Sequence, residues 1–142
     1  MASVVDDLNN LLARERGEVE ALRTVVQDLH STDPDLADSG DDVVQAGSWC
    51  CNGLYKRISQ LDGTPTLDST DLERQVSDKP DVPSKLKMVC SREKDDRSQV
   101  KHLLKRDDLD NDTREFLREM LDMHMEKARW CESTLDQWKH EE

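Results

Sequence analysis

Hydrophobic residues recur along the chain at alternating spacings of four and three in four separate segments. The first segment predicts a helix at about residues 4–30, and its stripe comprises Leu8, Leu12, Glu15, Val19, Leu22, Val26 and Leu29. This spacing places all of these side chains on one face of an α-helix, which then packs against a partner. One member of the stripe, Glu15, is an acid.

A second helix is predicted at about residues 41–61, after a polar segment in which Pro34 and Gly40 indicate a turn and a new helix start. Its stripe comprises Val43, Gly47, Cys50, Leu54, Ile58 and Leu61. Gly47 and Gly53 each lower the helix propensity by about 1 kcal/mol relative to alanine. We expect close approach of a neighbouring helix to compensate for this loss.

The segment 62–83 is predicted to be a crossover and not a continuous helix, because it contains Gly63 and several prolines, which interrupt helices. A connection of this length can run along a whole bundle, whereas a tight hairpin needs only a few residues. Thr70 and Glu73 have the spacing of a capping box and predict a short helical turn within the crossover.

Two further helices are predicted at about residues 84–106 and 112–139. The stripe of the third helix comprises Leu86, Cys90, Glu93, Arg97, Val100 and Leu104. The stripe of the fourth comprises Leu117, Leu121, His124, Ala128, Cys131, Leu135 and Trp138. Each of these stripes therefore carries a titratable residue near its middle, Glu93 in the third helix and His124 in the fourth.

The lengths of the connections predict the architecture. Four amphipathic helices with short first and last links and a long central link predict an all-α fold, a ferritin-like four-helix bundle with one crossover. A chain of 142 residues is long enough for one continuous core, so we expect residues 1–142 to form a single domain.

Composition excludes several functions. The net charge of −12 opposes a phosphate backbone, and no basic patch interleaved with aromatic residues is present, so no nucleic-acid partner is expected. No segment has the roughly 18–20 consecutive apolar residues that a membrane span requires, and the first residues lack the pattern of a secretory signal. We therefore expect a cytoplasmic protein that does not interact with membranes. The acidity itself is compatible with a high-salt environment and with an ordinary soluble protein.

The four cysteines are expected to be reduced in the cytoplasm, and no CxxC pair indicates a zinc or redox motif. Cys50, Cys90 and Cys131 lie on the hydrophobic stripes. A free cysteine in such a position is expected to act as a small core residue.

Glu15, Glu93 and His124 are inward residues near the middle of three different helices. Burying an unpaired carboxylate costs several kcal/mol, so these residues must find a partner, lose their charge or bind a metal. In di-iron bundles two helices each supply a Glu and two each supply Glu-x-x-His. Glu15, Glu93 and His124 match part of this set, but Leu121 replaces the glutamate before His124, and the second helix has no Glu-x-x-His.

Three short motifs resemble a bacterial ferritin-like family of unassigned function. They are LNNLLARER from Leu8, the Trp49–Cys50 pair followed by LDGTPT at 61–66, and MLDMH at 120–124. The corresponding family motifs are LNxLLxxER, DE-x-x-WC and ML-x-x-H, and the resemblance covers most of the chain. It implies a ferritin-like fold and implicates Glu15, Cys50 and His124. Gln45 and Ala46 replace the acids of the second motif, so a complete di-iron centre is not expected.

Three interpretations of the inward polar residues follow. Glu15, Glu93, Arg97 and His124 form a buried hydrogen-bonded network in the first, with Arg97 neutralising an acid. In the second, Glu15, Glu93 and His124, with Cys50 as a fourth ligand, hold one divalent ion of iron, manganese or zinc. In the third, the exposed surface of the bundle carries the function.

The favoured hypothesis is a small binding or assembly protein with a degenerate or absent di-iron site and no bound cofactor, and the alternative is a metal-binding ferritin-like protein. No phosphate-binding loop, nucleophile motif or HExxH helix is present, so no catalytic residue is assigned. An enzyme of this type would be a metal-dependent oxidoreductase. Tyr55, Trp130 and Trp138 near the stripes are compatible with a homodimer or another protein partner.

Overall fold

The computed structural model describes residues 3–141, with side chains described for residues 3–137. This part of the chain contains helices and no strand, which confirms the all-α prediction. The helices are α1 (Val4–Thr32), α2 (Pro34–Gln60), α3 (Leu72–Ser77), α4 (Val82–Leu103) and α5 (Asn111–Glu141). None of these helices, as far as they are described, combines the length and apolar character needed to cross a membrane. The side chain of Trp138, the last of the fourth stripe, lies outside the described residues.

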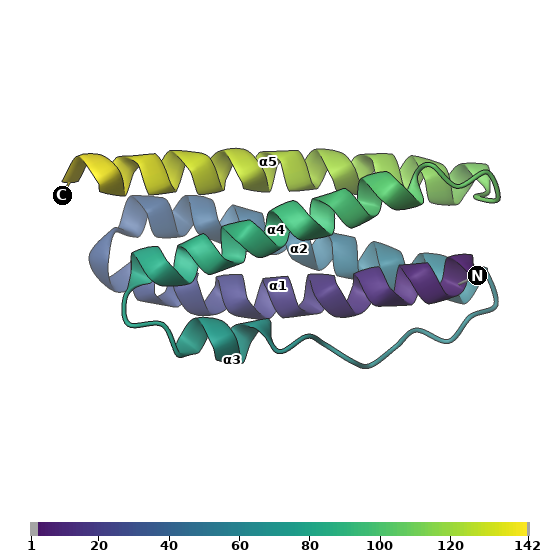
Figure 1. Ribbon diagram of the computed structural model, residues 1–142, viewed down its shortest axis with the longest axis horizontal. Helices are drawn as coiled ribbons and strands as arrows, with labels where there is room; N and C mark the ends of the chain where they lie inside the picture. Colours follow the sequence, from purple (N-terminus) through teal and green to yellow (C-terminus); the bar gives the residue numbers. More distant parts are fainter. Residues whose placement is uncertain (1–2, 142) are drawn as a thin grey trace.

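The four long helices lie side by side, and the connection from α2 to α4 returns along the full length of the molecule (Figure 1). α1 and α2 form one antiparallel pair, and α4 and α5 form another (Figure 1). α1 packs against α2 and α4, and α5 packs against the same two helices, while the short α3 covers α1 and α4. The interior is therefore enclosed by α1, α2, α5 and α4 in that order.

The first hairpin is tighter than the sequence pattern indicated. α2 begins at Pro34, so the prediction of a start near residue 41 was wrong. Asp33 alone separates the two helices, and its carboxylate caps α2 by accepting a hydrogen bond from the Leu36 N–H at 3.2 Å. Proline is favoured in the first turn of a helix, where its missing N–H has no intrahelical partner to lose. The residue that indicated a turn therefore starts the helix.

Glycines inside α2 allow neighbouring helices to approach closely, as predicted. A Cβ atom at Gly47 would lie 2.6 Å from Cγ2 of Val19 on α1. A Cβ atom at Gly53 would overlap the ring of Phe116 on α5. Contact at these two positions compensates for the low helix propensity of glycine.

The crossover is bound to α1 by polar contacts. The Asn9 side chain accepts a hydrogen bond from the Thr66 N–H at 2.8 Å, and the Thr70 N–H donates to the Ala13 carbonyl at 3.3 Å. α3 follows, but no side chain caps its first turn, so the prediction of a Thr70–Glu73 capping box was wrong. Thr70 faces α1 and its hydroxyl is buried there, which removes it from a capping position.

A disulfide between Cys90 and Cys131 links α4 to α5, with 5.8 Å between their Cα atoms. The expectation of reduced thiols was therefore wrong for this pair. The two residues occupy inward positions on adjacent antiparallel helices, where their Cα separation lies within the range that a disulfide spans. Cys50, which is buried, and Cys51, which is half-buried, are free thiols as expected.

The apolar core consists of two clusters. One contains Leu8, Leu11, Leu12, Cys50, Leu54, Ile58, Val100, Leu103, Leu109, Leu117 and Met120. The other contains Ala21, Leu22, Val25, Val26, Leu29, Ala37, Val43, Leu72, Val76, Leu86 and Val89. Residues 13–20 of α1 and 90–99 of α4 contribute to neither set of fully buried apolar residues. The middle of the molecule is thus available for polar residues.

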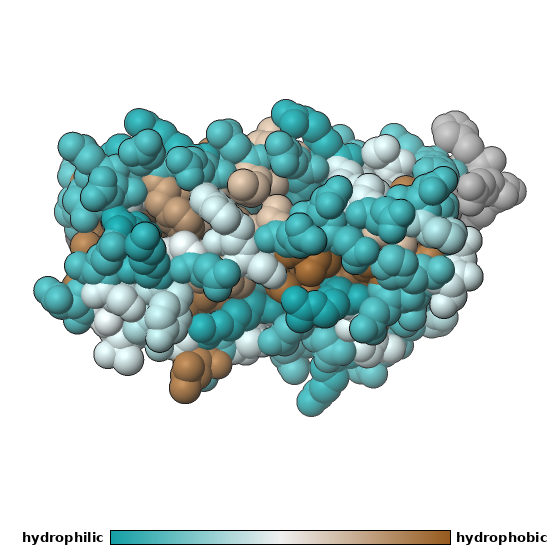
Figure 2. Space-filling model, turned by 180° about the vertical axis from the view of Figure 1, so that it is seen from behind, coloured by the Kyte–Doolittle hydropathy of each residue, from teal (hydrophilic) through white to brown (hydrophobic). Residues whose placement is uncertain are grey.

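The surface is predominantly hydrophilic on the face seen from behind, where apolar side chains gather in separate patches (Figure 2). Among residues 3–137, the large hydrophobic residues that remain exposed are Trp49, Tyr55 and Leu67.

Candidate functional site

A layer of titratable side chains fills the space between the two apolar clusters. It consists of Glu15 and Glu18 on α1, Glu93 and Asp96 on α4, and His124 and Lys127 on α5. None of these six residues is more than 3% exposed. Each helix contributes two residues spaced three apart, which lie on adjacent turns of one helix face. We call these six residues the polar layer.

His124 connects the three helices. Its Nδ1 lies 3.0 Å from Oε2 of Glu93, and its Nε2 is bonded to Oε1 of Glu15. Burial disfavours the charged imidazole, but the two carboxylates outweigh that effect and raise the pKa of His124 to about 10. The imidazolium therefore donates from both nitrogens at neutral pH.

Glu15 lies between two cations. Burial favours its neutral form, but Lys127 and His124 outweigh burial and lower the pKa of Glu15 below its ordinary value. The carboxylate is therefore ionised at neutral pH, although only one of its oxygens has a hydrogen-bond partner in the protein.

Arg97 pairs with Glu93 at the edge of the layer, as the sequence analysis expected. Its Nε lies 3.6 Å from Oε2 of Glu93, and its Nη1 donates to Sδ of Met125 at 3.3 Å. The Arg97 side chain is 19% exposed, so this guanidinium joins the layer to solvent.

Lys127 neutralises the second acid of α1. Its Nζ donates to Oε1 of Glu18 at 2.8 Å, and neither side chain is more than 4% exposed. Burial disfavours the ammonium ion, but the Glu18 and Glu15 carboxylates outweigh this and raise the pKa of Lys127 above its ordinary value. The charged lysine acts as a permanent internal cation.

Asp96 is a buried acid whose pKa is raised by burial and by Glu18. Burial and the hydrogen bond to Glu18 raise the pKa of Asp96 to about 9, even though Nε of Arg14 lies 2.5 Å from its Oδ1. Oδ2 of Asp96 and Oε2 of Glu18 are both buried without another partner. A proton on Asp96 satisfies both oxygens and keeps two adjacent carboxylates from being charged together.

A set of possible metal ligands lies within this layer. Glu15, Glu18 and His124 each offer one ligand atom, and these three atoms lie within 4.8 Å of one another. Of the four ligands predicted from sequence, the structure brings Glu15 and His124 into this set. Glu93 lies at the other ring nitrogen of His124.

Cys50, the fourth predicted ligand, lies on α2 in the first apolar cluster. Burial and the nearby Glu15 carboxylate raise the pKa of its thiol well above the ordinary value. The thiol is therefore protonated in the metal-free protein, and Cys50 lies outside the set formed by Glu15, Glu18 and His124.

Sequence reasoning missed Glu18, Asp96 and Lys127. Each of them lies three residues after Glu15, Glu93 or His124, which the sequence analysis identified. The predicted stripes instead continued with the residue four positions after each of these. A broad helix face includes both positions. The signal was therefore present as three pairs of titratable residues at a spacing of three.

Comparison of the chain with family models, with curated proteins and with solved structures finds no match. The interpretation of the polar layer thus rests on its residues and their geometry.

Replacing Asp96 with asparagine should flatten the dependence of stability on pH. The pKa of Asp96 is about 9 in the folded protein and 3.8 as its ordinary value, so the folded state binds the extra proton between these limits. Stability from this group is therefore present at low pH and is lost as the pH rises through about 9. Asp96→Asn, which mimics the neutral carboxyl, removes this loss.

The free energy of urea unfolding, measured from pH 5 to pH 9, tests this prediction. The wild-type protein should lose more stability over this range than Asp96→Asn, because only the wild type can ionise Asp96. His124 contributes an equal loss to both proteins. Asp95→Asn at the exposed neighbouring position serves as the control and should follow the wild type. Equal slopes for the wild type and Asp96→Asn would show that Asp96 is ionised in the folded protein.

Proposed function

We propose that the protein is a ferritin-like four-helix bundle that binds one divalent metal ion through Glu15, Glu18 and His124. The observation that carries this proposal is the clustering of their three buried ligand atoms within 4.8 Å. Two carboxylates and one imidazole suit iron, manganese or zinc. The short links of both hairpins and the long crossover support the ferritin-like connectivity.

The surrounding residues suit a site for one ion. Glu93, at Nδ1 of His124, orients the imidazole so that Nε2 faces the two carboxylates of α1. Oε2 of Glu15 and Oε2 of Glu18 are buried, and neither accepts a hydrogen bond in the structure apart from a proton that Asp96 can offer to Glu18. Each of these two oxygens can therefore accept a cation. When bound, the metal would supply a positive charge that replaces the proton of His124 between these carboxylates.

A complete di-iron centre does not fit these residues. His124 is the one histidine in the polar layer, and α2 contributes no carboxylate or imidazole to the layer among the described residues. Lys127 supplies a positive charge where a second metal would otherwise be needed to balance Glu18. We therefore propose a metal-binding module with a single ion and assign it no reaction.

Metal content tests the ligand set directly. Protein purified without chelators and then loaded with Zn²⁺ or Mn²⁺ should bind one ion per chain, as measured by elemental analysis and calorimetry. His124→Ala and Glu18→Gln should abolish binding because each removes a ligand. Glu93→Gln should weaken binding by roughly 10–100-fold because it removes only the partner that orients His124.

His102→Ala, at an exposed histidine outside the layer, provides the control and should bind normally. A protein that binds no metal, or a His124→Ala variant that binds as much as the wild type, would contradict the proposal. Loss of binding in Glu93→Gln combined with full binding in Glu18→Gln would support the ligand set predicted from sequence instead.

Lys127 should compete with the metal, because its ammonium group is bonded to one of the three ligands. Lys127→Gln removes this cation and should increase metal affinity, as measured by calorimetry. Lys85→Gln, which removes a lysine paired with Asp28 outside the layer, is the matched control and should leave affinity unchanged. A Lys127→Gln protein that binds metal no more tightly than the wild type would show that the ammonium does not occupy the metal's position.

A second function, assembly into a homodimer, is supported by the outer face of α2. Trp49 is 38% exposed and stacks on Phe116 of α5 with 5.4 Å between ring centroids, and Tyr55 is 50% exposed. Lys56 on α2 and Glu119 on α5 border the same hollow. A two-fold axis through this face would pair the basic residue of one copy with the acidic residue of the other. Trp130, in contrast, donates to Ser39 within the chain.

The molecular mass, measured by light scattering as the protein elutes from a size-exclusion column, tests whether it forms a dimer. Lys56→Glu should give a lower mass than the wild type, because it places an acid opposite Glu119 of the second copy. Leu67→Glu, at a residue that is 89% exposed on the crossover, is the control and should leave the mass unchanged. A wild-type protein that elutes with the mass of one chain would contradict this second function.

A further inference from the structure

We infer that solvent and metal ions reach the polar layer from a surface groove between α1 and α4, and that the side chain of Arg14 closes this route. The solvent part of the inference stands on the geometry alone. The metal part rests on the proposed function.

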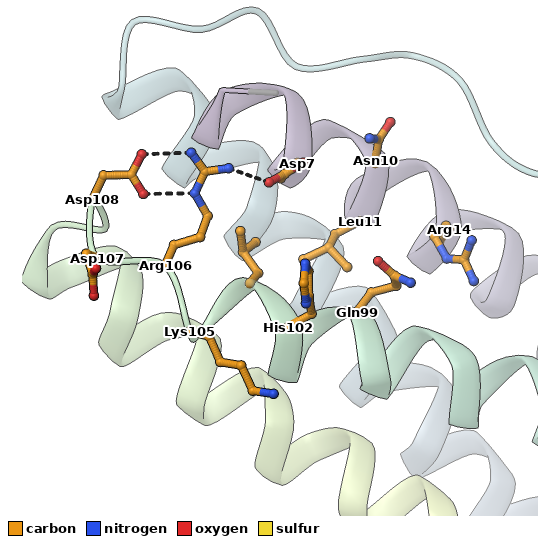
Figure 3. A pocket seen from close by; sticks show the side chains of 11 residues that line it. Asp7, Asn10, Leu11, Arg14, Gln99, His102, Lys105, Arg106, Asp107 and Asp108 are labelled. Atoms are coloured by element: carbon orange, nitrogen blue, oxygen red, sulfur yellow. Dashed lines mark hydrogen bonds and ion pairs between the residues drawn. The ribbon is translucent and has the colours of Figure 1, made fainter. Parts of the chain in front are cut away.

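The groove lies between the first half of α1 and the end of α4 and has a volume of about 660 Å³. Arg106 lies at one end, held by Asp7 at 2.6 Å and by Asp108 at 2.7 Å, and Arg14 lies toward the other end beside Gln99 (Figure 3). The groove therefore has one arginine fixed by surface carboxylates and another that faces the interior.

Arg14 belongs both to the groove and to the interior network. Its side chain is 31% exposed, while the Asp96 side chain that it contacts through Nε at 2.5 Å is 1% exposed. Among the described residues that line this groove, Arg14 is the one with a hydrogen bond to the polar layer. Movement of this one side chain would expose Asp96 to the groove.

Glu18, a proposed metal ligand, follows directly behind Asp96. Asp96 and Glu18 are both buried, and the Glu18 carboxylate is close enough to raise the pKa of Asp96, so a cation that reaches Asp96 meets the next ligand beside it. The guanidinium of Arg14 opposes this passage in two ways. It occupies the space in front of Asp96, and its positive charge repels an approaching cation.

The edge of the layer at Arg97 offers a less direct route. Arg97 also joins the layer to solvent, but it contacts Glu93, which lies outside the proposed ligand set, and it does not line the groove. The Arg97→Ala variant therefore removes a positive charge, as Arg14→Ala does, but does not open the groove. Arg106 lines the same groove and is held there by Asp7 and Asp108, so Arg106→Ala is the matched control.

Exchange of side-chain N–H protons with solvent tests the route in the metal-free protein. NMR should show several-fold faster exchange of the His124 ring protons and the Lys127 ammonium protons in Arg14→Ala than in the wild type. Arg106→Ala, which removes a groove arginine held by Asp7 and Asp108, should exchange as the wild type does. Arg14→Lys, which keeps a cation and a long side chain, should give a smaller increase and covers the case in which Arg14→Ala does not fold.

Rates of Co²⁺ loading and release, followed by absorption, test the route for ions. Arg14→Ala should accelerate both rates several-fold and change the dissociation constant much less, because a gate alters access and not the ligands. Arg97→Ala, which removes a nearby charge without opening the groove, should change the two rates unequally. Equal rates in Arg14→Ala and Arg106→Ala would overturn the inference.

The two experiments separate this inference from the proposed function. Faster proton exchange in Arg14→Ala with no Co²⁺ bound by any protein would support the route and contradict metal binding. Tight Co²⁺ binding with wild-type exchange and loading in Arg14→Ala would support metal binding and contradict the route.

Discussion

A charged imidazole buried between two carboxylates is the interaction on which the rest of this structure depends. His124 contacts Glu15 of α1 and Glu93 of α4 through its two ring nitrogens, and all three side chains are at most 2% exposed. Removing one member of such a buried ionic set leaves an uncompensated charge and costs about 3–5 kcal/mol. The position of α5 relative to α1 and α4 is therefore set by charge as well as by apolar packing. The two apolar clusters and the burial of the layer lower the local dielectric, which strengthens each ion pair.

The polar layer also explains why a metal and a lysine are alternatives in this interior. The ionised acids of the layer need positive charge, and His124, Lys127 and the two peripheral arginines provide it without an ion. A divalent ion at Glu15, Glu18 and His124 would replace the His124 proton and compete with Lys127. Metal affinity then depends on the free-energy difference between the layer with a bound ion and the layer neutralised by protonated His124 and Lys127. The number of ligands alone does not give this difference.

The sequence pattern predicted much of the architecture. The four long helices, the crossover and the convergence of Glu15, Glu93 and His124 follow from stripes with regular spacing, because periodicity directly reports which face is inward. The start of α2 was not predictable from Pro34, because proline indicates both turns and first helical positions. The Cys90–Cys131 disulfide was missed because the distance between two helices is not visible in their separate periodicities.

The second half of the site was missed for a geometric reason. A stripe that takes one residue per turn follows the step of four from Glu15, Glu93 and His124 and omits the step of three. Glu18, Asp96 and Lys127 lie at those omitted positions, and their pairing depends on the angle at which α1, α4 and α5 cross. Arg14 was equally hidden, because only the fold places it beside Asp96.

The protonation state of His124 in the metal-free protein tests the central interaction most directly. Nitrogen chemical shifts of the His124 ring, followed by NMR from pH 5 to pH 11, report this state. We expect an imidazolium with both nitrogens protonated at pH 8 and a titration near the pKa of about 10. A neutral imidazole at pH 8, or a titration near the ordinary value of 6.5, would show that the carboxylates do not hold a charge at the centre of the molecule.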